Sequence, residues 1–214
     1  AVARGCACAL LFSEIGAAYY ERAGFQVIPR TLVTLDVAPP PHGRGAPATF
    51  VRSGETSDLP FIAEISARYR EGSAFALDRS RDLIEFFFTR RRLLAGLGRE
   101  GAREVEFFVT EEGHRPVAYV FITRGPRGIV LEECGDRDPS GARIGAMLQV
   151  LAARNPHEPD RHLQGWLPPS VRPPQVTVTE GLASPEIMML HPLGNVASSI
   201  QDISPIVYWQ TDVF

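Results

Sequence analysis

The sequence has no long hydrophobic run and few cysteines. None of its apolar stretches reaches the roughly 18 residues that a membrane-spanning helix needs, so we expect no membrane span. The apolar stretch Cys6–Leu11 is too short to be the core of a secretory signal. The 3 cysteines, two of them one residue apart, make a poor disulfide framework. These absences favour a protein of the reducing cytoplasm.

The sequence also lacks a strong excess of charge of either sign. Its formal net charge is −3 and its pI is about 6.0, so nothing indicates a nucleic-acid-binding surface. With 214 residues, of which 44% are hydrophobic, the chain can bury the core of one domain or of two small ones. We therefore expect neither nucleic acid nor a membrane as a partner.

Motifs for metals and for covalent catalysis are missing as well. Cys6 and Cys8 have no further ligands at zinc spacing, and no Gly-x-Ser-x-Gly motif occurs. Residues 136–141 resemble the start of a calcium loop, but Met147 stands where that loop needs a bidentate acid. The sequence thus predicts no metal site.

A segment rich in proline and glycine, Ala38–Pro47, predicts a semi-rigid linker. Before it lie a strand-like run (residues 6–12), a short helical stretch ending at Gly24 and a strand (residues 26–37). We therefore divide the chain into residues 1–38, a linker at 39–47 and a domain at 48–214.

The third part begins with two helices and a meander of strands. Leu83, Ile84 and Phe87 repeat at helical spacing, whereas the strands are separated by turn residues. The first predicted helix starts near residues 56–60, and two more span residues 79–96 and 141–155. The predicted strands span residues 49–52, 105–110, 115–123, 128–133, 162–167, 186–190 and 205–210. This order predicts an α+β fold.

One motif carries chemical information: Ser13, Gly16, Tyr20, Gly24 and Phe25, placed between two strands. Its spacing resembles the pattern Asn-x-x-Ala-x-x-x-Tyr-x-x-x-Gly-Phe near the end of the GNAT superfamily of N-acetyltransferases. Tyr, Gly and Phe match in place, while Ser13 and Gly16 replace Asn and Ala. The resemblance implies that Tyr20 lies beside the sulfur of coenzyme A, and that Ser13 and Gly16 contact the cofactor.

The resemblance also implies a fold and an activity. The fold is a GNAT-like mixed, mostly antiparallel sheet flanked by helices, preceded by the strand–helix–strand tail of a first GNAT domain. The activity is transfer of acetyl from acetyl-CoA to a primary amine by direct attack, with Tyr20 protonating the leaving thiolate. The implied acceptor is a small-molecule or lysine-type amine, and a homo-oligomer is compatible with the family.

Other interpretations remain open at this stage. Tyr20 can be an aromatic residue that packs one helix face, and Ser13 can be an ordinary helix N-cap. The chain as a whole can be a non-catalytic GNAT-like module that forms an acceptor groove or a subunit interface. No metal is needed in either case.

The loop that holds the cofactor pyrophosphate in this family, Gln/Arg-x-x-Gly-x-Gly/Ala, is expected upstream of Ala1 in a longer protein. In the domain at 48–214 the nearest counterpart is Arg137-x-x-Ser140-x-Ala142. Pro139 lacks an N–H, and Asp136 and Asp138 place negative charge beside an anionic ligand. We therefore expect this domain to be degenerate and the chain alone to be inactive.

Two narrower similarities concern tandem GNAT proteins. A second GNAT-like domain after the first is a feature of the enhanced intracellular survival acetyltransferases. The stretch Leu11–Gly16 and the ending Tyr208–Phe214 are similar to fungal lysine N-acetyltransferases.

Overall fold

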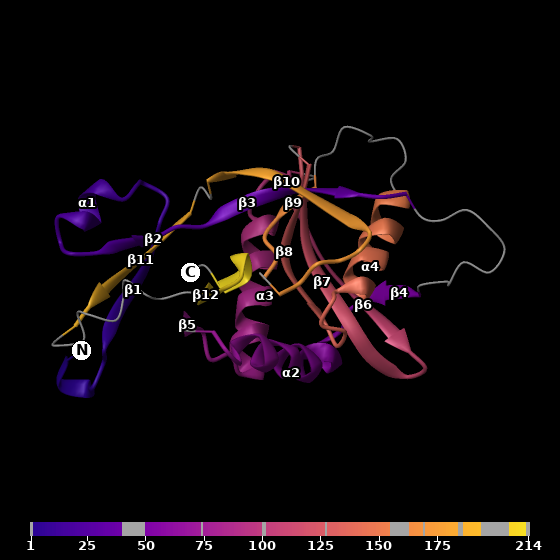
Figure 1. Cartoon of the computed structure of the whole chain (residues 1–214), viewed down its shortest axis with the longest axis horizontal. Coiled ribbons are helices and arrows are strands. Elements are labelled where there is room, and N and C mark those ends of the chain that lie inside the picture. The colour runs from indigo at the N-terminus through magenta and orange to yellow at the C-terminus, as the bar shows by residue number, and fades with distance from the viewer. Residues whose placement is uncertain are drawn as a thin grey trace.

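The computed structural model describes residues 2–39, 50–73, 75–99, 102–126, 128–154, 163–168, 170–183, 186–193 and 206–212 (Figure 1). The helices are α1 (Ala18–Glu21), α2 (Leu59–Arg70), α3 (Arg81–Gly96) and α4 (Ala142–Ala153), with short 3-10 helices η1 (Val2–Arg4), η2 (Thr56–Asp58) and η4 (Gln210–Asp212). The strands are β1 (Cys8–Ser13), β2 (Gln26–Ile28), β3 (Thr31–Val37), β4 (Val51–Ser53), β5 (Phe75–Ala76), β6 (Glu104–Glu112), β7 (Arg115–Gly125), β8 (Gly128–Asp136), β9 (Leu163–Gly165), β10 (Val176–Ala183), β11 (Ile187–Pro192) and β12 (Ile206–Val207).

A seven-stranded sheet in the order β10-β3-β9-β8-β7-β6-β4 forms the larger part of the molecule. All its described pairings are antiparallel except the parallel pairing of β8 with β9. A three-stranded sheet, β1-β11-β2, lies at one end of the molecule, with α1 beside it (Figure 1). This is the predicted α+β fold with a mixed, mostly antiparallel sheet flanked by helices.

Strand β7 shows why helices cover both faces of the large sheet. Its side chains alternate between two cores because successive strand residues point to opposite faces. Val120 and Ile122 pack with α4, whereas Tyr119 and Phe121 pack with α2 and α3. All four are at most 1% exposed, so both faces of the middle of this strand are covered.

The predicted strand at residues 26–37 is wrong as one continuous element. It breaks after Ile28, and its two halves, β2 and β3, join different sheets. Pro29 explains the break, since a residue without an N–H cannot donate to a strand ladder.

The two sheets exchange strands across the predicted linker. Strand β3 precedes the linker but lies between β9 and β10, which follow it. Strand β11 follows the linker but lies between β1 and β2, which precede it. Residues 40–49, which include most of the predicted linker, lie outside the described residues, and the division into 1–38, 39–47 and 48–214 stays a prediction.

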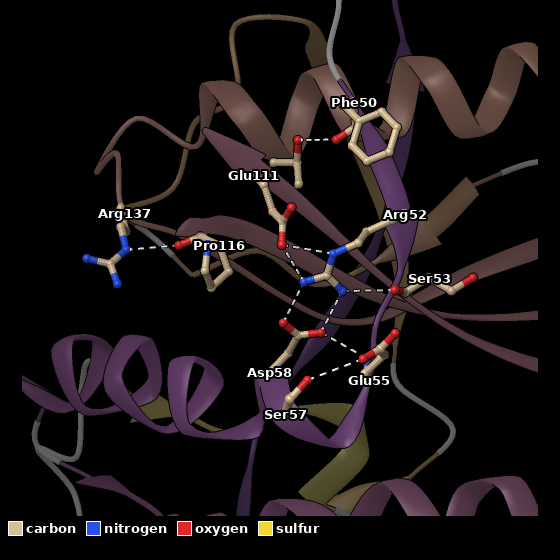
Figure 2. A network of polar contacts seen from close by, with 10 residues as sticks. Phe50, Arg52, Ser53, Glu55, Ser57, Asp58, Glu111, Pro116 and Arg137 are labelled. Carbon is tan, nitrogen blue, oxygen red and sulfur yellow. Dashed lines mark hydrogen bonds and ion pairs between the residues drawn. The ribbon is translucent and has the colours of Figure 1, made fainter. Parts of the chain in front are cut away.

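A charged network fixes the edge strand β4 to η2 and β6 (Figure 2). The Arg52 guanidinium donates to both carboxylate oxygens of Asp58, at 2.8 and 2.7 Å, and to Glu111 Oε1 at 2.6 Å. The Asp58 carboxylate also accepts the backbone N–H of Glu55, so that Asp58 completes a capping box at the start of η2. The N-cap of η2 is Glu55.

No helix among the described residues is long and apolar enough to cross a membrane.

Candidate active site

The turn after β1 brings two of the three predicted site residues together. Ser13 is the last residue of β1 and is 2% exposed, and its Oγ donates a hydrogen bond to the Gly16 carbonyl at 2.8 Å. Gly16 has a φ of 96°, a conformation that favours glycine. The alternative that Ser13 caps the following helix is wrong, because α1 starts only at Ala18 and its N-cap, Ala17, makes no side-chain hydrogen bond.

Tyr20 lies on α1 and is half-buried, whereas its neighbour Tyr19 is 70% exposed. The Tyr20 ring stands edge-on to Tyr19 and to Phe25, with centroids 5.1 and 6.1 Å apart. Among the residues that the structure describes, none hydrogen-bonds to the Tyr20 hydroxyl. Its ring is therefore packed against two neighbouring aromatic rings.

The Gly-Phe pair of the motif packs on β11. Gly24 has a φ of 87°, and a Cβ atom there would come within 2.8 Å of the His191 ring. The His191 Nδ1 lies 2.8 Å from the Gly24 carbonyl oxygen, and its ring lies 5.2 Å from that of Phe25. Glycine is thus required twice over, for its backbone conformation and for its space. No local sequence signal could have identified His191, which comes 167 residues later.

The loop before α4 uses its own side chains to occupy its backbone donors. Asp136 accepts the N–H groups of Asp138 and Arg143, at 2.8 and 2.9 Å. Asp138 accepts the N–H of Ser140 at 2.9 Å, and Ser140 accepts that of Ala142 at 3.3 Å. Burial raises the pKa of Asp136, although its hydrogen bonds with Asp138 and Arg143 oppose that rise. These donors therefore already have acceptors within the chain.

The segment after β9 covers the same helix end. A Cβ atom at Gly141 would lie 2.7 Å from Val171, and one at Gly145 would lie 2.0 Å from Gln175. The N–H of Arg172 also donates to the Ser140 carbonyl at 3.1 Å. The N-terminal turn of α4 is consequently packed by protein.

A buried charged cluster lies on the face of the sheet opposite α4. Arg79 donates to both oxygens of Glu133, at 2.7 and 2.9 Å, and Glu133 also accepts the Tyr119 hydroxyl at 2.8 Å. Glu133 and Tyr119 are fully buried. Burial, followed by the negative charge of Glu133, raises the pKa of Tyr119 well above its usual value. This cluster was not predicted from the sequence, although a glutamate beside the apolar residues of β8 was a usable signal.

The chain has the fold of GCN5-related N-acetyltransferases. A probable N-acyltransferase of unknown function from Enterococcus faecalis superposes with a TM-score of 0.56 at 8% identity, covering 89% of this chain and 46% of its own. A GCN5-related N-acetyltransferase from Kribbella flavida gives 0.56 at 16% identity, covering 90% and 44%. One from Anabaena variabilis gives 0.52 at 10% identity, covering 88% and 46%.

This chain therefore spans slightly under half the length of these solved structures. No protein-family model matches the sequence, and no curated protein does.

Proposed function

We propose that this chain is part of an N-acetyltransferase that transfers acetyl from acetyl-CoA to a primary amine. The observation that carries the proposal is the β1–turn–α1 unit, which places Ser13, Gly16 and Tyr20 in sequence within a GNAT fold. We make this activity a proposal for the intact protein, since this chain spans under half of the structures it resembles.

Direct transfer needs no covalent enzyme intermediate. The neutral amine attacks the thioester carbonyl, the carbon–sulfur bond breaks, and the attacking nitrogen releases a proton to solvent. The departing thiolate takes a proton from an acid that solvent then reprotonates. We assign that proton to the Tyr20 hydroxyl, whose ring is held by Phe25. Ser13 and Gly16 would form the cofactor-facing turn, which their hydrogen bond keeps in one conformation.

The proposed acceptor is a small molecule or a lysine-type side chain that carries a primary amine.

The three cysteines are free thiols, with Cys6 exposed and Cys134 buried, which supports a reducing cytoplasmic setting. A homo-oligomer fits the proposal but is not required by it.

The test is Tyr20→Phe in the intact protein. The substitution removes only the hydroxyl, so folding should be unchanged and the maximal rate should fall by roughly ten- to a thousand-fold, with acetyl-CoA affinity nearly constant. Tyr19→Phe is the matched control, because Tyr19 is exposed on the same helix. Full turnover in both variants would show that Tyr20 only packs.

A second candidate function applies to the domain at 48–214. The loop before α4 has its backbone donors occupied by Asp136, Asp138 and Ser140. This favours a non-catalytic GNAT-like module that shapes an acceptor groove or a subunit interface, with catalysis left to the unit that contains Tyr20.

A further inference from the structure

Two consecutive aromatic residues near the C-terminus enter two different cores. Tyr208 packs in the core of the three-stranded sheet, with Ile28, Met188 and Leu190, and its ring lies 5.6 Å from that of Phe12. Trp209 packs in the core of the seven-stranded sheet. Tyr208 and Trp209 are 4% and 1% exposed. The chain therefore passes between the two sheets at this point (Figure 1).

The residues around this pair attach to the larger part of the molecule. Strand β12 pairs in parallel with β5. In η4, the Thr211 hydroxyl donates to Glu133, and Asp212 Oδ1 lies 3.0 Å from Arg79 Nε. Asp212 Oδ2 also accepts the backbone N–H of Trp209 at 2.8 Å, which closes the turn.

From this geometry we propose that residues 206–212 form a proton-sensitive clasp. The C-terminal clasp holds the three-stranded sheet against the seven-stranded sheet, and it docks more tightly in weak acid than at neutral pH. The inference does not depend on whether Tyr20 is catalytic.

The charges that face Asp212 explain the expected response to protons. One guanidinium, Arg79, is shared by two buried carboxylates, Glu133 on β8 and Asp212 on η4. Arg30, between β2 and β3, also acts on Asp212, but its guanidinium stacks on the Tyr208 ring at 4.3 Å. The Tyr119 hydroxyl on β7 donates a hydrogen bond to Glu133. When both acids are ionised, the Arg79 site carries one buried negative charge in excess.

The pKa of Asp212 follows from that excess. Burial raises it from 3.8 to about 6, with Arg79 opposing the rise and Glu133 adding to it. A pKa that is higher in the docked than in the undocked state means that docking takes up a proton. The stabilisation is complete below the undocked pKa and is lost as pH rises through about 6.

Hydrogen exchange of the clasp tests the proposal directly. Protection of a peptide covering residues 206–212, corrected for intrinsic exchange, is compared at about pH 5 and about pH 7.5, and should be roughly tenfold higher at the lower pH. Asp212→Asn removes the titrating group and should bring this ratio close to one. Asp36→Asn, which changes an exposed acid on β3, should leave the tenfold ratio intact.

A second variant tests whether the clasp holds the small sheet. Tyr208→Ala removes the ring from the core of that sheet, so protection should fall for residues 26–28 and 187–192, while β6 and β7 keep theirs. Equal wild-type protection at both pH values overturns the proposal, whether or not Asp212→Asn folds. So does a pH response that survives Asp212→Asn, or a small sheet that is unaffected by Tyr208→Ala.

Discussion

Asp136 Oδ2 accepts the backbone N–H of Arg143 at 2.9 Å, which places a carboxylate at the first turn of α4. Binding of a second anion there would require this acid and its neighbour Asp138 to give up their hydrogen bonds. The electrostatics and the hydrogen bonding of the loop therefore oppose a phosphate ligand at this helix end.

The 214-residue chain should bind acetyl-CoA with a Kd weaker than about 0.1 mM, because the backbone N–H groups of Asp138, Ser140, Ala142 and Arg143 already have acceptors within the chain. Isothermal titration calorimetry measures this directly. A low-micromolar Kd would mean that Asp136 and its loop rearrange into a working site, and it would remove the support for a non-catalytic module.

Limited proteolysis should cut between Pro39 and Ala46 before it cuts anywhere within residues 50–200, as expected of a linker rich in proline and glycine. The two fragments should nevertheless elute together in size-exclusion chromatography, because β3 lies between β9 and β10. They should separate only in denaturant. Early cuts within β6 to β8, or fragments that part without denaturant, would contradict this expectation.

The sequence specifies local elements, but it does not specify which distant strands pair with one another. Local patterns correctly predicted α3, α4 and the meander of β6, β7 and β8, since helical spacing and turn residues are properties of neighbouring positions. The partners of β3 and β11 depend on contacts between residues more than a hundred positions apart. Strand β10, whose pairing with β3 contains a register shift between Thr179 and Leu182, was not predicted.

In the candidate site, too, local spacing could be predicted from the sequence and long-range contacts could not. The spacing of Ser13, Gly16 and Tyr20 was visible in the sequence, whereas the packing of His191 on Gly24 was not. The cluster of Arg79, Glu133 and Asp212 joins three distant parts of the chain. Such a cluster can be suspected from one buried acid, but its partners cannot be assigned without the fold.

Arg79→Met should destabilise the protein by about 3–5 kcal/mol, because it leaves Glu133 and Asp212 buried without their cation. Urea denaturation followed by circular dichroism gives the free energy of unfolding. Arg68→Met is the matched control: it removes an exposed pair with Glu64 on α2 and should cost at most about 0.5 kcal/mol. Equal losses in the two variants would show that burial of the Arg79 cluster has no energetic consequence.

Acid should weaken the ion pair between Arg52 on β4 and Asp58 on η2. Burial opposes ionisation of Asp58, but the hydrogen bonds from Arg52 and from the Glu55 N–H prevail and lower its pKa below 3.8. Because the folded-state pKa is the lower one, the stabilisation is present above about pH 4 and is lost as pH falls through the folded value.

Denaturation of wild type and Asp58→Asn over this range measures that contribution. The variant should be less stable at neutral pH, and the difference between the two should shrink as pH falls below about 4. Asp36→Asn, at an exposed position, should follow the wild-type curve. A difference that stays constant with pH would assign the effect of Asp58→Asn to shape rather than to charge.

The placement of β3 and β11 limits how this protein can be recombined. Composition makes the linker the obvious breakpoint. A break there would separate β3 from the rest of the seven-stranded sheet and β11 from the rest of the three-stranded sheet. A chimaera that joins residues 1–38 to a foreign second domain would succeed only if that domain brought strands that fit β1, β2 and β3. We therefore expect the segments before and after the linker to be exchanged only together, and substitutions in a strand of one segment to be compensated in its partner strand from the other.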